Sequence, residues 1–195
     1  MAETVTSKGS GRGSRWRVAA WSFVGLLLLL PAVAMQFTSE VVWTLSDFVV
    51  MGAMLLTAGL VLEGLIRVSR SVPYRLGAGA AVLAGFGLVW VNGAVGFLGD
   101  EGNPANLAFL LVHATAIGGA LLARFRASGM ARTMIATAVV QVLVAAVGFA
   151  AGLASPGGAG VFEVVMGSTL FGGLWLASAA LFGWAARDAA LARPA

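Results

Sequence analysis

The sequence predicts an all-α polytopic membrane protein in which six transmembrane helices form a bundle. Hydrophobic residues make up 59% of the 195 residues and charged residues only 10%, whereas soluble domains have about 45–50% and about 25%. Six apolar segments are long enough to cross a bilayer, which takes about 20 residues. The 27 glycines suit the close approach of packed membrane helices. Lipid is therefore the solvent that we expect around most of the chain.

Each span is predicted from an apolar run and the polar turns that bound it. Thr38 or Ser39 is a candidate N-cap for the second span, and Asn103-Pro104 opens the fourth as N-cap and first helical residue. The transmembrane domain is expected at residues 15–188, between a disordered tail at 1–14 and a short tail at 189–195. Within this domain the spans are expected at about 18–37, 41–68, 74–98, 104–125, 131–153 and 162–186.

The first apolar segment allows two interpretations. Arg15 and Arg17 precede it, and it runs through five leucines to Pro31-Ala-Val-Ala34, which imitates the cleavage site of a signal peptide. The apolar run nevertheless continues to Phe37, which makes it about 20 residues long and sufficient to span. We favour a retained helix, with cleavage after Ala34 as the alternative.

The distribution of charge predicts the orientation of the chain. All twelve Lys and Arg residues lie in the N-terminal tail, the second and fourth turns, the C-terminal tail or the helix ends beside them. Because cationic segments stay in the cytoplasm, six spans with both termini cytoplasmic follow. The net charge of +4 is thereby explained as a topology signal, so we expect membrane lipid and no nucleic acid as a partner.

Polar side chains inside a bilayer are costly and mark candidate functional positions. Glu63 stands four residues before Arg67, and this spacing predicts a helical ion pair. A pocket open to the outer face is predicted from residues at similar depth beside small side chains: Asp47, Asn92, Asn106, His113 and Gln141. For Asn92, His113 and Gln141 the alternative is hydrogen bonding between helices, which serves packing alone.

Asp47 receives particular weight in this prediction. It is expected about six residues into the second span, roughly 9 Å deep at about 1.5 Å per residue. The Arg residues of the predicted spans stand at their cytoplasmic ends, so none is available to pair with it, and an unpaired carboxylate in the membrane is costly. A functional role for Asp47 is therefore favoured.

No catalytic residue, cofactor or metal site is predicted. The absence of cysteine and the single histidine exclude thiolate zinc sites and a bis-histidine haem. Met35, Met51 and Met54 would suit copper(I), although methionine usually serves packing. Asn103–Ala105 reads NPA, the aquaporin signature, but that signature requires two copies and this chain has one. Because no nucleophile motif or phosphate loop is present, an enzyme is not favoured.

Three stretches of the sequence resemble a known family. They are LLPAVAMQFTSEVVWTLSDFVVMGAMLL (29–56), VWVNGAVGFLGDEGNPANLAF (89–109) and ARFRASGMARTMIATAVVQ (123–141). They are similar to a family of small, uncharacterised inner-membrane proteins of proteobacteria. The resemblance covers most of residues 29–150 and fades in the last span. It implies a bacterial inner-membrane location and a retained first helix, and it supplies no catalytic residues.

Two classes of function are consistent with these observations. The first is a small transport, permeation or ligand-binding protein that uses the outward-facing pocket. The second is a non-catalytic accessory or scaffold subunit, whose Gly- and Ala-rich helix faces contact a second copy or a partner membrane subunit. The first is slightly favoured, because a carboxylate is costly to keep within a bilayer.

Overall fold

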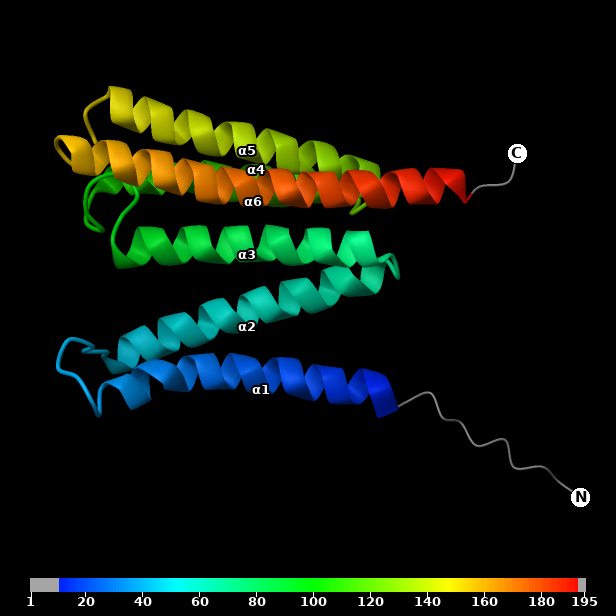
Figure 1. Ribbon diagram of the computed structural model, residues 1–195, viewed down its shortest axis with the longest axis horizontal. Helices are drawn as coiled ribbons and strands as arrows, with labels where there is room; N and C mark the ends of the chain where they lie inside the picture. Colours follow the sequence, from blue (N-terminus) through cyan, green and yellow to red (C-terminus); the bar gives the residue numbers. More distant parts are fainter. Residues whose placement is uncertain (1–10, 193–195) are drawn as a thin grey trace, which may run out of the picture. The chain divides into compact units, whose positions relative to one another are not determined.

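The computed structural model describes residues 11–192, with side chains from Arg17 onward (Figure 1). Every regular element in this range is a helix: α1 (Gly11–Ala34), α2 (Leu45–Val68), α3 (Val72–Ala94), the 3₁₀ helix η1 (Pro104–Phe109), α4 (Leu110–Leu122), α5 (Ala127–Ala150) and α6 (Gly158–Leu191). Six helices in the described range, counting η1 with α4, are long and apolar enough to cross a membrane. The predicted all-α fold with six membrane-spanning helices is confirmed.

The observed helix bounds differ from the predicted ones for local reasons. Helix α2 begins at Leu45 rather than 41, and α3 ends at Ala94 because Gly96 has a positive φ of 76°, a conformation that glycine adopts at little cost. Helix α6 continues to Leu191, into the expected tail. Residues 11–14 belong to α1, while the rest of the expected N-terminal tail lies outside the described residues.

The chain divides into two compact units, residues 1–60 and 61–195. In the N-terminal unit, α1 meets the first part of α2 at small residues. A Cβ atom at Gly59 would lie 2.9 Å from the Trp21 ring, and one at Gly52 would lie 3.6 Å from Leu28. Most other apolar side chains of α1 are exposed, as suits a helix surrounded by lipid.

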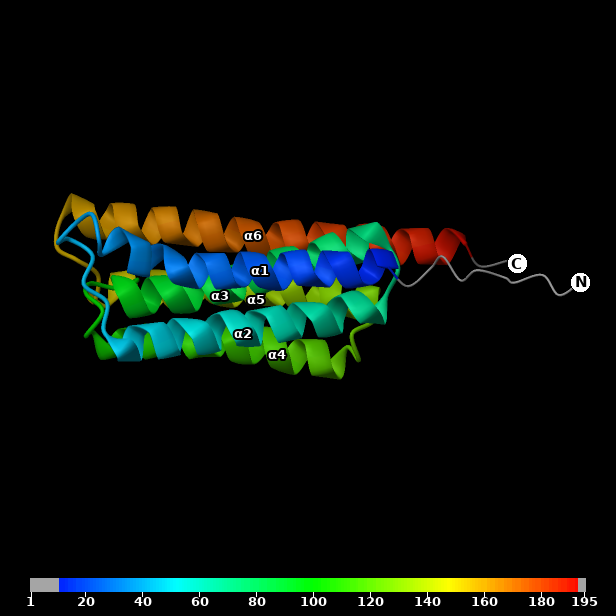
Figure 2. The ribbon, with the colours of Figure 1, turned by 90° about the horizontal axis from the view of Figure 1, so that it is seen from below.

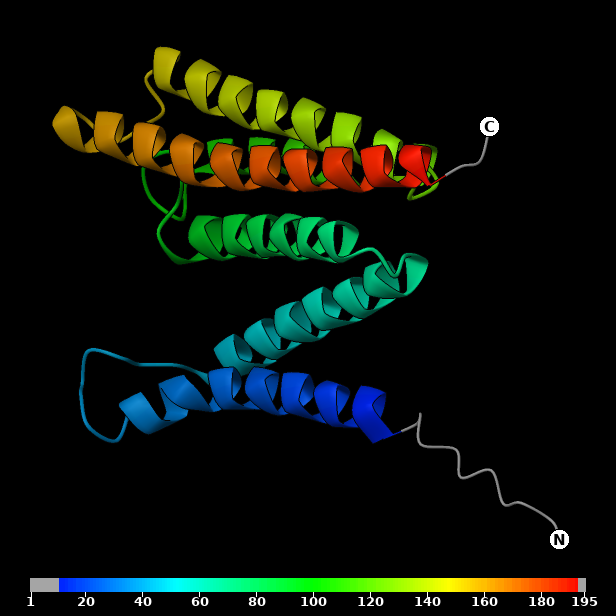
Figure 3. The same cartoon turned by 45° about the vertical axis from the view of Figure 1, so that its right-hand side comes forward.

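In the C-terminal unit, helices α3 to α6 run alternately up and down as a four-helix bundle (Figures 1 and 3). Helix α5 packs against α4 and α6, and α6 also packs against α3. Figures 1 and 2 together place α3 opposite α5 and α4 opposite α6. The core between them is apolar and includes Tyr74, Leu88, Phe97, Phe109, Met130, Met134, Phe171, Trp175 and Phe182.

Glycines allow the helices of this bundle to approach closely. A Cβ atom at Gly119 of α4 would lie 2.5 Å from Cγ2 of Thr133 on α5, and one at Gly87 of α3 would lie 3.0 Å from the Phe171 ring on α6. Such contacts are typical of membrane helices, in which packing and not water exclusion drives association. The abundance of glycine is therefore explained in part by helix packing.

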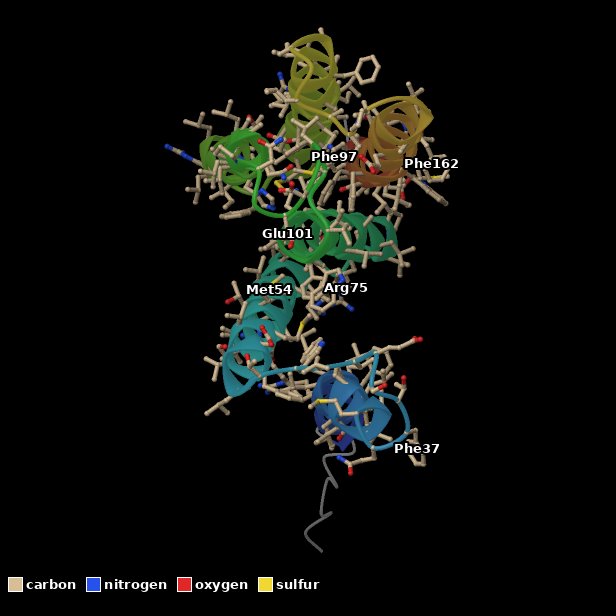
Figure 4. The ribbon with its side chains drawn as sticks, turned by 90° about the vertical axis from the view of Figure 1, so that its left-hand side faces the viewer. Phe37, Met54, Arg75, Phe97, Glu101 and Phe162 are labelled. Atoms are coloured by element: carbon tan, nitrogen blue, oxygen red, sulfur yellow. The ribbon has the colours of Figure 1, made fainter. Side chains whose placement is uncertain are left out.

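The two ends of the C-terminal unit differ in charge. We call the end formed by loops 95–103 and 151–157 the acidic end, because Asp100, Glu101 and Glu163 lie there, and the end formed by turns 69–71 and 123–126 the cationic end. Figure 4 looks onto the acidic end, where Phe97 points between α4, α5 and α6. The Phe97 ring lies 4.5 Å from that of Phe109 and 6.2 Å from that of Phe171. These rings close the core at the acidic end.

Candidate functional site

Asp47 has a structural role at the start of α2, which corrects its predicted position. Its carboxylate accepts hydrogen bonds from the backbone N–H of Thr44, at 2.7 Å, and from the Thr44 hydroxyl, at 2.8 Å, while the Thr44 hydroxyl accepts from the backbone N–H of Asp47 at 3.4 Å. This reciprocal arrangement is a capping box. Asp47 is exposed and lies in the first helical turn, so it is neither unpaired nor deep in the span. The sequence signal was Thr44-Leu-Ser-Asp47, which matches the capping-box spacing.

Asn103 caps the helical segment that leads into α4, as predicted. Its side-chain oxygen accepts a hydrogen bond from the backbone N–H of Ala105, and Pro104 occupies the first helical position. Its amide nitrogen donates to the carbonyl oxygens of Leu98 and Leu153, both at 2.9 Å. Asn103 therefore also joins the two loops of the acidic end.

Asn106 is buried and its hydrogen-bonding groups are occupied by its own loop. Its side-chain oxygen accepts from the backbone N–H groups of Phe97, at 3.0 Å, and Leu98, at 2.8 Å. Its amide nitrogen donates to the carbonyl oxygens of Asp100, at 2.8 Å, and Leu98, at 3.4 Å. An Asn side chain offers two donors and two acceptor sites, so Asn106 is a clamp of loop 95–103 with no group left for a ligand.

Glu63 and Arg67 form the ion pair that their spacing predicts, with 2.7 Å between Oε1 and Nη2. The Arg67 side chain is 64% exposed and that of Glu63 only 13%. The pair lies near the end of α2 in the C-terminal unit. Its position and geometry fit a structural role at the helix end.

His113 joins α4 to α3. Its Nε2 lies 3.0 Å from the carbonyl oxygen of Gly85 on α3, and its Nδ1 lies 3.1 Å from that of Phe109 in its own helical segment. A Cβ atom at Gly85 would lie 4.0 Å from Nε2, in ordinary van der Waals contact, so the position is close to the ring without requiring glycine for this hydrogen bond. The packing interpretation of His113 thus has direct geometric support.

Gln141 is the predicted residue with the most unusual surroundings. It is fully buried on α5, and neither its amide nitrogen nor its amide oxygen has a hydrogen-bond partner. Asn92 is half-buried; its nitrogen donates to the carbonyl oxygen of Leu88 within its own helix, and its oxygen has no partner. Neither side chain makes the hydrogen bond between helices that the packing alternative requires.

Two further residues have similar surroundings, and of these sequence reasoning missed Trp175. The indole nitrogen of Trp175, which is 2% exposed, has no partner, and neither does Oε2 of Glu163, whose Oε1 accepts from the Ser155 hydroxyl at 3.1 Å. A tryptophan N–H that is buried usually finds an acceptor. The signal that could have identified Trp175 was a tryptophan near the middle of a span, away from the membrane interfaces where the residue is enriched.

Contacts between helices bring Gln141, His113 and Trp175 to one depth of the bundle. A Cβ atom at Gly85 would lie 3.7 Å from the Trp175 ring and 4.0 Å from His113. A Cβ atom at Gly172, one turn from Trp175, would lie 3.9 Å from Val142, the neighbour of Gln141. At about 1.5 Å of rise per residue, the three side chains originate within roughly one helical turn of depth. We call them the core polar group.

The five residues that were predicted to line one pocket therefore do not lie together in the structure. Asp47 belongs to the N-terminal unit and caps α2. Asn106 is saturated within its loop. Asn92 lies on α3 seven residues from Gly85, which places it on the same helix face about 10 Å nearer the acidic end. Only His113 and Gln141 share one depth.

The described part of the chain contains no group of three or more His, Cys, Asp or Glu side chains that could hold a metal ion. The six apolar helices are compatible with an integral, multi-pass membrane protein. No family model, curated protein or solved structure matches the chain. The fold therefore defines the class of protein, and its activity has to be argued from the core polar group.

Proposed function

We propose that this protein is an integral protein of a bacterial inner membrane that binds, and by binding helps to move, a small uncharged polar solute in its C-terminal unit. The observation that carries the proposal is Gln141, which is 0% exposed and has no partner for either amide atom. An unsatisfied buried polar group costs about 1–3 kcal/mol. A guest that donates and accepts hydrogen bonds would offset this cost.

The chemistry of the surroundings indicates the class of solute. Gln141 offers two donors and an acceptor, and Trp175 offers one donor. The sequence has no Asp, Glu, Lys or Arg at 76–99, 102–123, 133–162 or 164–186, so the core supplies no fixed charge for an ion. A small molecule that carries both donors and acceptors, such as urea, or water itself, fits this set. Charged solutes would meet an uncompensated desolvation cost.

The acidic end is the side from which we propose that the solute enters. Glu163, at this end, has an unpartnered oxygen, and so does Asn92, which lies on α3 between this end and the core polar group. Phe97, Phe109 and Phe171 fill the core at the same end. This aromatic closure favours a binding step inside a closed core over a permanently open channel, and entry would require Phe97 to move.

Flux measurements on proteoliposomes test this proposal. Urea and water entry would be followed by stopped-flow light scattering for the wild type, Gln141→Leu and empty liposomes. We expect the wild type to exceed empty liposomes and Gln141→Leu to lose most of the excess, since leucine keeps the volume and removes the amide. The control is Gln36→Leu, because Gln36 is the other glutamine of the sequence and is exposed. Equal flux for wild type and Gln141→Leu would exclude Gln141 as the binding residue.

The proposed orientation has both termini and the cationic end in the cytoplasm, as the positive-inside rule requires. Reporter fusions test it directly. A fluorescent protein that folds only in the cytoplasm should be bright after residue 195, and alkaline phosphatase should be active when inserted at residues 155–157. The reverse pattern would reject the orientation and the direction of entry with it.

An accessory or scaffold subunit is the second candidate function, and open glycines on the outer surface favour it. A Cβ atom at Gly79, Gly118, Gly173 or Gly183 would meet nothing within 4 Å, so these positions present flat helix surfaces to a neighbour. Small residues at such positions allow helices of a second copy or another subunit to approach. Purification in mild detergent as a lone monomer, without a co-purifying protein, would count against this role.

A further inference from the structure

At the cationic end of the C-terminal unit, a long-range hydrogen bond joins α3 to the turn between α4 and α5. The hydroxyl of Tyr74, at the start of α3, donates to the carbonyl oxygen of Phe125 in the turn between α4 and α5, at 2.8 Å. Tyr74 is 2% exposed, and its ring packs edge-on against Phe182 at 4.9 Å. Turns 69–71 and 123–126, which are far apart in sequence, are therefore held together at one place.

The second of these turns has an unusual backbone. Arg124 and Phe125 have φ angles of 50° and 56°, in the left-handed region that residues other than glycine rarely adopt. Strained backbone of this kind persists only where the surrounding structure imposes it, and it often occurs at ligand sites. Phe125 packs against the core while Arg124 and Arg126 on either side are exposed. The turn thus exposes two arginines on either side of a residue that packs against the core.

In the described part of the chain, the arginines on these two turns and in the first turn of α3 have no acidic partner. Arg70, Arg75, Arg124 and Arg126 are all exposed, and no ion pair involves them among the described residues. Nε of Arg75 donates to the carbonyl oxygen of Ser69 at 3.0 Å, which leaves its terminal nitrogens available. The sequence has no carboxylate at 64–99 or 102–162. Among the described residues, these four arginines therefore carry charge that no ion pair neutralises.

We propose that these four arginines bind the phosphate headgroup of an anionic phospholipid. The ends of α2, α3, α4 and α5 place them where the spans reach the membrane surface, and basic sites between transmembrane helices bind such headgroups. A topology signal requires only positive charge, which lysine supplies equally well, whereas the planar arginine fork matches a phosphate with two hydrogen bonds. The cations of the two turns and of the first turn of α3 are all arginine, as are eleven of the twelve cations of the sequence.

Lipid binding in nanodiscs tests the proposal. The protein would be reconstituted in phosphatidylcholine alone or mixed with phosphatidylglycerol, and bound lipid would be counted by native mass spectrometry. We expect retained phosphatidylglycerol on the wild type and a roughly tenfold weaker affinity for the double variant Arg124→Gln/Arg126→Gln, the loss expected for a charge-assisted hydrogen bond. Equal retention by the two proteins would overturn the proposal.

Two further variants distinguish lipid binding at a specific site from lipid binding that depends only on the net charge of the protein. Arg187→Gln removes a cation from the C-terminal part of α6 and should leave the affinity unchanged; a tenfold loss there would show that only total charge matters and would reject the site. Tyr74→Phe keeps every charge and removes the hydrogen bond to Phe125, so an intermediate loss is expected. The exposed arginine variants should unfold at the wild-type temperature in phosphatidylcholine, which separates lost lipid binding from misfolding.

Discussion

Nε2 of His113 lies 3.0 Å from the carbonyl oxygen of Gly85, and this contact joins α4 to α3 directly. Both ring nitrogens face carbonyl oxygens, which only accept hydrogen bonds, so a neutral ring can donate to one of them at a time; we expect the proton on Nε2, whose contact is the shorter of the two. Nδ1 then faces the carbonyl oxygen of Phe109, at 3.1 Å, without a proton of its own. In the doubly protonated ring, both nitrogens would donate a hydrogen bond. The single histidine of the chain is thus a structural link at the depth of Gln141 and Trp175.

The tautomer of His113 is therefore a first prediction. In neutral protein labelled with ¹⁵N histidine, the chemical shifts should report the Nε2–H tautomer. His113→Phe should lower the free energy of unfolding by about 0.6–1.7 kcal/mol, the range for hydrogen bonds between membrane helices. An Nδ1–H tautomer would show that Gly85 is not the acceptor.

Asn106 should be important for stability and not for ligand contact. Asn106→Ala leaves the backbone N–H groups of Phe97 and Leu98 without their acceptor, so we expect a loss of about 2–3 kcal/mol, since each unsatisfied buried group costs about 1–3. Thermal unfolding in detergent and limited proteolysis of loop 95–103 would measure it. The control is Leu107→Ala, because Leu107 is 66% exposed. Equal stability of the two variants would contradict the proposed role of Asn106 in holding loop 95–103.

Two adjacent glycines of α4 should respond oppositely to the same substitution. A Cβ atom at Gly119 would lie 2.5 Å from Thr133, while one at Gly118 meets nothing within 4 Å. Gly119→Ala should destabilise the protein by about 1–3 kcal/mol through overpacking. Gly118→Ala should be neutral, or stabilising by up to about 1 kcal/mol because alanine favours helix. Thermal unfolding of both variants in the same detergent measures this difference in stability. An equal loss of stability in both variants would contradict the close contact between α4 and α5 at Gly119.

Asp47 should stabilise the first turn of α2 and should have no effect on solute flux. Asp47→Ala removes the acceptor for the backbone N–H of Thr44, so faster hydrogen–deuterium exchange is expected in the first turn of α2. Thr44→Ala should produce the same fraying, since the two residues form one capping box. Urea and water flux should stay at the wild-type level. A large loss of flux in Asp47→Ala with unchanged exchange would restore the functional interpretation of this carboxylate.

The correct and incorrect predictions have different physical origins. The ion pair of Glu63 with Arg67 and the cap at Asn103 depend on neighbours within four residues, so spacing alone predicts them. Asp47 was misplaced because the apolar run at residues 41–43 looks like helix, and the capping box that starts α2 at Leu45 was not recognised. Trp175 was overlooked because a tryptophan in an apolar helix is usually interpreted as a packing residue. Only its surroundings in the structure show that its N–H has no acceptor.

The sequence by itself determined the class of protein, since the length of apolar runs and the distribution of charge are properties of the chain read in order. It could not determine which polar side chains are satisfied. Those partners come from distant segments: Gly85 lies 28 residues from His113, and Phe125 lies 51 residues from Tyr74. Only the tertiary structure decided that Asn106 is saturated and that Gln141 is not, because a hydrogen bond depends on where two groups meet in space.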